Sequence, residues 1–213
     1  MLVVHTALLR EFRLAPGAVR RVPPGAQRQA AAVDQHVGFL CELLHHHHTG
    51  EDEHLWPPLR ERLPAGALPL LEAAEAQHAA IGQALSRVAA ARRRWTAGPG
   101  CPDAADRDAL AEALRALHAL LAEHLDAEER TLLPLAAAHL TEQEWLAIGE
   151  AAVAALPKSA MPLVIGMFAY EGDPEVLAGM LHSAPVLVRL VIPRVAPRVY
   201  ARRAAAVYGT PRP

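Results

Sequence analysis

Apolar residues recur every three or four positions along most of the first 140 residues, which is the period of one face of an α-helix. The pattern predicts four long helices, over residues 2–21, 26–63, 67–95 and 103–139. Clusters of proline and glycine separate them, including a loop over residues 96–102. We find no alternating run of β-branched residues that would predict a strand. The expected fold class is therefore all-α, with the four helices in an up-down-up-down bundle.

Polar residues occupy several places on these apolar stripes where the spacing calls for leucine. The first and third helices each carry a lone histidine there, and the second and fourth each carry a His-x-x-x-Glu pair. The six residues are His5, His47, Glu51, His78, His124 and Glu128. Residues 45–57 align with residues 122–134 without a gap, so the chain contains an internal repeat of helix pairs. Because residues four apart share a helix face, we expect all six side chains to meet inside the bundle.

Metal ions would make this set of buried polar groups tolerable. An unpaired carboxylate in an apolar core costs several kcal/mol, and no Lys or Arg lies on the same stripe segments. A single histidine on a stripe is more often a hydrogen-bonded core residue, but here four recur with two carboxylates. Imidazole and carboxylate without thiolate favour iron, manganese or zinc. With two bridging carboxylates and one bridging oxo or hydroxo group, the set nearly fills two octahedral ions and leaves room for a small ligand.

The run of four histidines at residues 45–48 leaves the register of the second helix open. His47/Glu51 and His48/Asp52 both have the required spacing. The repeat has no histidine opposite His48, so we choose His47/Glu51 and keep the other pair as the alternative. On this choice His48, Asp52 and Glu129 lie at the rim and orient the ligands.

His36 lies about three turns before His47 on nearly the same line of the helix. It is either a core residue or a residue that controls access to the site. A ferritin-like site would need Glu-x-x-His on two helices, and this spacing does occur at Glu51 and Glu75. The fourth helix lacks it, which disfavours that arrangement.

Composition narrows the function classes. The net charge is −2, which does not favour nucleic acid or an anionic membrane as a partner. Two cysteines are too few for a disulfide framework, and we expect a cytoplasmic location without a signal peptide or membrane span.

We divide the chain into a bundle over residues 1–140 and a helical extension over residues 141–213. The extension begins with a capping box at Thr141 and Glu144, and its short proline-punctuated helices either pack on the bundle or form a homodimer surface.

The blocks around His5, residues 47–57, residues 77–78 and residues 124–134 resemble a hemerythrin-like, HHE cation-binding domain. The resemblance covers about residues 2–140, and the extension resembles the tails of many actinobacterial members. It implies a non-haem di-iron centre in a four-helix bundle, with His5, His47, Glu51, His78, His124 and Glu128 as ligands. Oxygen-carrying members have a further histidine one turn before His78, where this chain has Ala74. That departure counts against simple reversible oxygen carriage.

The sequence thus supports three hypotheses. The first is a di-iron protein that binds O2, peroxide or nitric oxide in sensing or detoxification, with catalase-like turnover left open. The second is a non-enzymatic protein that stores iron or buffers oxygen. The third is a metal-free interaction bundle.

Overall fold

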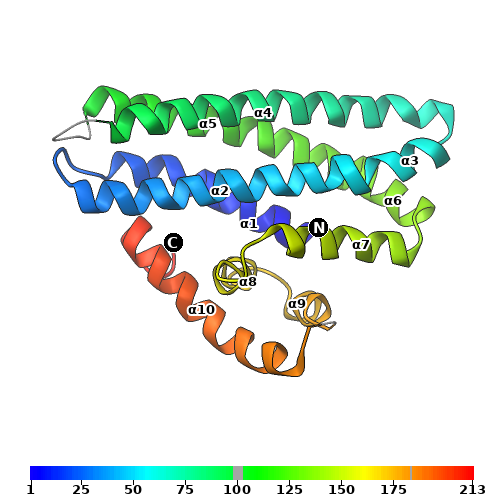
Figure 1. Cartoon of the computed structure of the whole chain (residues 1–213). Coiled ribbons are helices and arrows are strands. Elements are labelled where there is room, and N and C mark those ends of the chain that lie inside the picture. Colours follow the sequence, from blue (N-terminus) through cyan, green and yellow to red (C-terminus); the bar gives the residue numbers. More distant parts are fainter. Residues whose placement is uncertain (98–102, 183) are drawn as a thin grey trace.

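The computed structural model describes residues 1–97, 103–182 and 184–213, so most of the expected 96–102 loop lies outside the described residues. The described parts are helical and contain no strand. Four long helices lie side by side with alternating direction and form the expected bundle (Figure 1). They are α1 (Leu2–Arg20), α2 (Gln27–His54), α4 (Leu68–Thr96) and α5 (Ala104–Ala127).

Two of the expected helices are interrupted at equivalent places of the repeat. Helix α2 ends at His54 and is followed by α3 (Trp56–Arg62), a seven-residue helix that precedes a 3₁₀ turn, η1 (Ala65–Ala67). Helix α5 passes into a π-helical turn, η2 (Glu128–Leu132), before α6 (Leu133–His139). Both interruptions come just before a proline, Pro57 or Pro134, whose nitrogen cannot donate a helical hydrogen bond. The expected single helices over 26–63 and 103–139 are therefore composite.

The buried apolar residues form two clusters rather than one. The larger cluster includes Leu44, Ile81 and Leu121, and the smaller one includes Leu55 and Leu132. On α2 and across α5 and η2, the polar stripe residues lie between members of the two clusters. A polar layer thus divides the apolar interior of the bundle, and this layer holds the candidate site.

The C-terminal part adds helices to one side of the bundle. They are α7 (Glu142–Ala155), α8 (Met161–Phe168), α9 (Pro174–Met180) and α10 (Val186–Tyr208). The capping box expected at Thr141 and Glu144 is present. Helix α7 contacts α2, α8 contacts α1 and α10, and α10 also contacts α1 and α2 (Figure 1). Three of these helices are short, whereas α10 has 23 residues and continues through Pro193 and Pro197.

Helices α8 and α10 approach closely because residue 166 is glycine. A Cβ atom at Gly166 would collide with the backbone carbonyl of Ala196. The N-terminal half of α10 leaves Val186, Leu187 and Leu190 more than half exposed. The division of the chain at residue 140 and the homodimer surface stay predictions.

A buried carboxylate joins the C-terminal helices to the bundle. The Glu11 side chain accepts hydrogen bonds from the hydroxyls of Tyr200 and Tyr208 at 2.6 Å each, and from the Arg10 guanidinium at 2.9 and 3.0 Å. His36 Nε2 lies 3.0 Å from Glu11 Oε2. Burial alone would raise the pKa of Glu11, but His36 and the two tyrosines outweigh it and hold the pKa at about 2. His36 thus sits in a core cluster with the C-terminal helix.

Replacing Tyr208 by phenylalanine is expected to lower the free energy of unfolding by about 1–3 kcal/mol, because a buried carboxylate loses a donor. Equilibrium denaturation in urea measures the change. Tyr170→Phe is the control, since its hydroxyl donates to the Pro213 carbonyl in a part-buried position and its loss should cost less. Equal losses in the two variants would show that the Glu11 cluster does not stabilise this junction.

Candidate metal centre

Imidazoles and carboxylates from all four bundle helices meet in the polar layer. They are His5 from α1, His47, His48 and Glu51 from α2, His78 from α4, His124 from α5 and Glu128 from the π-helical turn. Each side chain is less than one-tenth exposed. The six residues picked out by the sequence pattern are therefore brought together in one place, with His48 beside them.

The ligand atoms fall into two groups that share one residue. In the first group, one ligand atom from each of His48, Glu51, His78 and His124 lies within 4.8 Å of all the others. The same criterion holds for the second group, made of His5, His47 and Glu51. Glu51 belongs to both, which is the arrangement that a carboxylate between two cations would have.

The carboxylate oxygens face imidazole nitrogens on both sides. Glu51 Oε1 lies 3.3 Å from His47 Nε2, and Glu51 Oε2 lies 3.5 Å from His78 Nε2. Glu128 Oε2 lies 3.7 Å from Nε2 of both His5 and His124. Two carboxylates thus lie between histidines of opposite groups.

Many of these buried atoms have no hydrogen-bond partner among the described residues. They are Nε2 of His5, His47 and His48 and both carboxylate oxygens of Glu51 and Glu128. Leaving one buried polar atom unsatisfied costs about 1–3 kcal/mol. The unsatisfied atoms gathered here would therefore lower the stability of the fold considerably. Nitrogen and oxygen lone pairs directed at a common centre are the donor set of a cation site. The residues present therefore fit a metal centre.

Burial makes the protonation states suit metal binding. It lowers the pKa of His5 and of His124 to about 3, so both imidazoles keep a free lone pair at neutral pH. It also raises the pKa of Glu128 to about 8, and burial together with the charge of Glu128 raises that of Glu51 well above its ordinary value. Without a cation both carboxyls hold their protons, and a cation would displace them.

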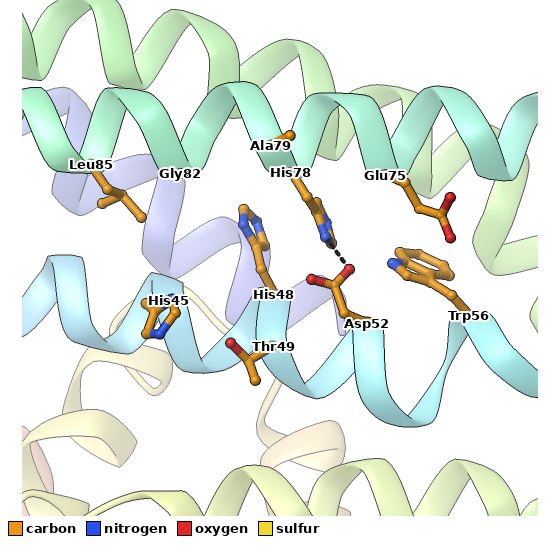
Figure 2. A pocket seen from close by; sticks show the side chains of 10 residues that line it. All are labelled: His45, His48, Thr49, Asp52, Trp56, Glu75, His78, Ala79, Gly82 and Leu85. Carbon is orange, nitrogen blue, oxygen red and sulfur yellow. Dashed lines mark hydrogen bonds and ion pairs between the residues drawn. The ribbon is translucent and has the colours of Figure 1, made fainter.

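Carboxylates outside the cluster fix the orientation of two imidazoles. His78 Nδ1 donates to Asp52 Oδ1 at 2.7 Å, a contact drawn in Figure 2. His5 Nδ1 donates to Glu129 Oε1 at 2.8 Å. With the proton on Nδ1, each ring presents its Nε2 lone pair to the centre. Asp52 and Glu129 thus lie against these imidazoles from outside the cluster, and their role in a metal site stays a prediction.

Gln77 supplies a third contact of this kind that sequence reasoning did not assign. Its side-chain oxygen lies 3.2 Å from His124 Nδ1. Gln77 lies on α4 whereas His124 lies on α5, and spacing along one helix carries no information about such a contact.

His48 lies inside the site rather than at its rim. It is 6% exposed, and its ring stacks on His78 with the centroids 4.1 Å apart. His47 faces the other group, with its ring centroid 5.1 Å from that of His5. Neighbouring positions on a helix are about 100° apart, yet these two long imidazoles reach opposite sides of the same layer. Both histidines thus face inward, and which of the two pairs binds the ions stays a prediction.

Comparison with known proteins adds an independent finding. The family model described as the Hemerythrin HHE cation binding domain matches residues 1–136. No curated protein and no solved structure matches the chain. The matched region ends within α6, so α7 to α10 lie beyond it. None of the described helices has the length and apolar character that crossing a membrane requires.

Proposed function

This chain belongs to the hemerythrin HHE cation-binding family, and we propose that its bundle holds two iron ions and binds O2, peroxide or nitric oxide in a sensing or detoxifying role. The observation that carries the proposal is the sharing of Glu51 between two groups of buried, unpartnered ligand atoms. One shared carboxylate between two donor groups favours a pair of ions over a single one.

We assign His48, His78 and His124 to one ion and His5 and His47 to the other, following the two groups. Glu51 belongs to both groups and is assigned to both ions. Glu128 lies in neither group, and we assign it to both ions because its Oε2 lies 3.7 Å from Nε2 of both His5 and His124. This set exceeds the four ligands of a structural zinc site, and its nitrogen and oxygen donors suit iron, with manganese as the next candidate. When bound, iron would supply Lewis-acid and one-electron redox chemistry.

The chain's own residues contribute geometry and a dry surrounding. Asp52, Glu129 and Gln77 hold three imidazoles in the tautomer that faces the centre. The two apolar clusters exclude water above and below the polar layer. The free thiol of Cys41 is compatible with the reducing cytoplasm that we propose as its location.

The assignment predicts that His47→Ala and His48→Ala each lose about one of the two ions, because each removes a ligand from a different group. Elemental analysis of protein purified without a histidine tag measures the content. His54→Ala is the matched control, since His54 is 42% exposed on the same helix and its ring lies 3.9 Å from the exposed carboxylate of Glu53. Full metal content in both site variants would contradict the division.

Peroxide separates the enzymatic proposal from the alternative of iron storage or oxygen buffering. Iron-loaded protein is mixed with hydrogen peroxide while an electrode records dissolved oxygen and a spectrometer records visible absorption. We expect a change in the visible spectrum on mixing, which reports ligand binding. Oxygen release no faster than that of free iron would rule out catalase-like turnover and favour the non-enzymatic role.

A further inference from the structure

A groove between α2 and α4 leads from the surface to the edge of the metal centre. It has a volume of about 460 Å³, and side chains from α2 and α4 line its walls together with Trp56 of α3 (Figure 2). His48 and His78, which lie in one of the two ligand groups, form its floor. The groove therefore touches one side of the centre.

The groove exists because two residues of α4 are small. Ala79 and Gly82 line it and are exposed, and a Cβ atom added at Gly82 would meet no atom within 4 Å. Leu85, one turn further along α4, does carry a side chain into this space (Figure 2). A leucine at position 82 would thus fill the opening without displacing the backbone.

The ligand layer comes near solvent at the floor of the groove. His48 and His78 are 6% and 7% exposed there, whereas Glu51 and His124 of the same group are 0% exposed. In the other group, His5 is 0% exposed and the side chain of His47, which does not line the groove, is 8% exposed. On the His48 side, solvent therefore meets the centre at the floor of the groove.

The charge of the groove favours some ligands over others. Asp52 and Glu75 line it, and none of its described lining residues is Lys or Arg. Arg60, outside the lining, donates to Glu75 at 2.5 Å and partly offsets its charge. A cleft with carboxylates and low-dielectric walls lowers the local concentration of anions and leaves uncharged molecules unaffected.

We propose that this groove is the entry path by which uncharged small molecules reach the His48 side of the centre, and that its carboxylates select against anions. The proposal rests on the proposed function in one respect, namely that metal ions lie at the floor of the groove. The path itself is a property of the chain and can be tested without metal.

The first test uses the indole of Trp56, which lines the groove and is 2% exposed. Trp95→Phe and Trp145→Phe leave Trp56 as the only tryptophan of the chain. In this metal-free background, Gly82→Leu should lower the quenching constant of acrylamide, an uncharged quencher, several-fold. Gly149→Leu is the matched control, because Gly149 is an exposed helical glycine of α7 with no atom within 4 Å of an added Cβ. Equal quenching in the two variants would overturn the path.

The second test addresses charge at constant, low ionic strength. Iodide, an anion, should quench Trp56 several-fold less than acrylamide in the same protein. Glu75→Gln removes a carboxylate and leaves Arg60 without that partner, so it should raise iodide quenching while acrylamide quenching stays constant. The selection against anions would be overturned if iodide quenched Trp56 as strongly as acrylamide does. It would also be overturned if Glu75→Gln left iodide quenching unchanged.

The third test separates failure of the path from failure of the proposed function. Stopped-flow mixing of nitric oxide with the ferrous protein should show a several-fold slower association in Gly82→Leu than in Gly149→Leu. If quenching responds to Gly82→Leu but no variant binds nitric oxide, the path stands and the proposed function fails. If nitric oxide binds at the same rate in both variants, the ligand enters elsewhere and the path fails.

Discussion

Replacing Glu51 by glutamine is expected to remove most of the bound iron while leaving the metal-free fold at least as stable as before. Glu51 is the one residue common to both ligand groups, so its loss weakens both ions at once. An amide cannot supply the negative charge that a carboxylate offers to two cations. In the metal-free protein, the pKa of Glu51 is raised well above its ordinary value by burial, so the folded state already holds this side chain neutral. Keeping this carboxyl protonated at neutral pH costs free energy of folding, and a neutral amide of the same shape removes that cost.

Elemental analysis and thermal unfolding of the same samples measure the two effects. Glu53→Gln is the matched control, because Glu53 lies two residues away on the same helix and is 65% exposed. It should keep both ions and the stability of the unmodified protein. Retention of two ions by Glu51→Gln would contradict the sharing of Glu51.

Loading the metal-free protein with ferrous iron is expected to raise its thermal midpoint by about 10 °C or more. A ligand that binds only the folded state at a thousand times its Kd adds about 4 kcal/mol. In a chain of this size each kcal/mol shifts the midpoint by about 2–4 °C. Anaerobic calorimetry with and without two equivalents of iron measures the shift, and Glu51→Gln should show little of it. No shift in the unmodified protein would mean that the buried groups are satisfied in another way.

The iron-induced rise of the thermal midpoint should grow as the pH increases from 6.5 to 8, because the metal-free protein loses stability over that range. Unfolded Glu128 ionises near 4.5, but burial keeps the folded carboxyl protonated up to about 8, so the unfolded state binds fewer protons and stability falls with rising pH. The buried imidazoles of the cluster, whose pKa is lowered by burial, act in the opposite direction, most strongly below their ordinary pKa of 6.5 and less as the pH approaches 8. Between pH 6.5 and 8, Glu128 lowers the free energy of unfolding of the metal-free protein by about 2 kcal/mol.

The variant Glu128→Gln isolates this contribution in the metal-free protein. The Met1 ammonium titrates in the same window with the opposite sign, because burial lowers its pKa. The quantity to compare is therefore the change in unfolding free energy between pH 6.5 and 8 in the two proteins. Equal changes would show that Glu128 ionises normally in the folded state.

Periodicity along single helices carried much of the architecture. Core-facing positions repeat every three to four residues, so the stripes located α1, α2, α4 and α5 and picked out polar residues that do meet in the interior. The same periodicity predicts continuous helices over residues 26–63 and 103–139. It does not predict the break at Leu55 or the π-helical turn that begins at Glu128, because these depend on how the chain accommodates Pro57 and Pro134.

Other features depend on how helices face one another, which spacing cannot show. Gln77 reaches His124 across two helices, and Tyr208 reaches Glu11 from the far end of the chain. Spacing along α2 places His48 at the rim because a stripe has one centre line, whereas the polar layer receives imidazoles from both His47 and His48. The groove beside Gly82 likewise arises only when α2 and α4 are set side by side.

Diffraction from iron-loaded crystals at the iron absorption edge would locate the bound ions. We expect two anomalous peaks about 3.5–4 Å apart, the spacing typical of two-metal sites, on either side of the Glu51 carboxylate. One peak should lie beside His48, His78 and His124, and the other beside His5 and His47. An anomalous map with no peak in this layer, or with iron bound only at the exposed histidines of α2, would contradict this expectation.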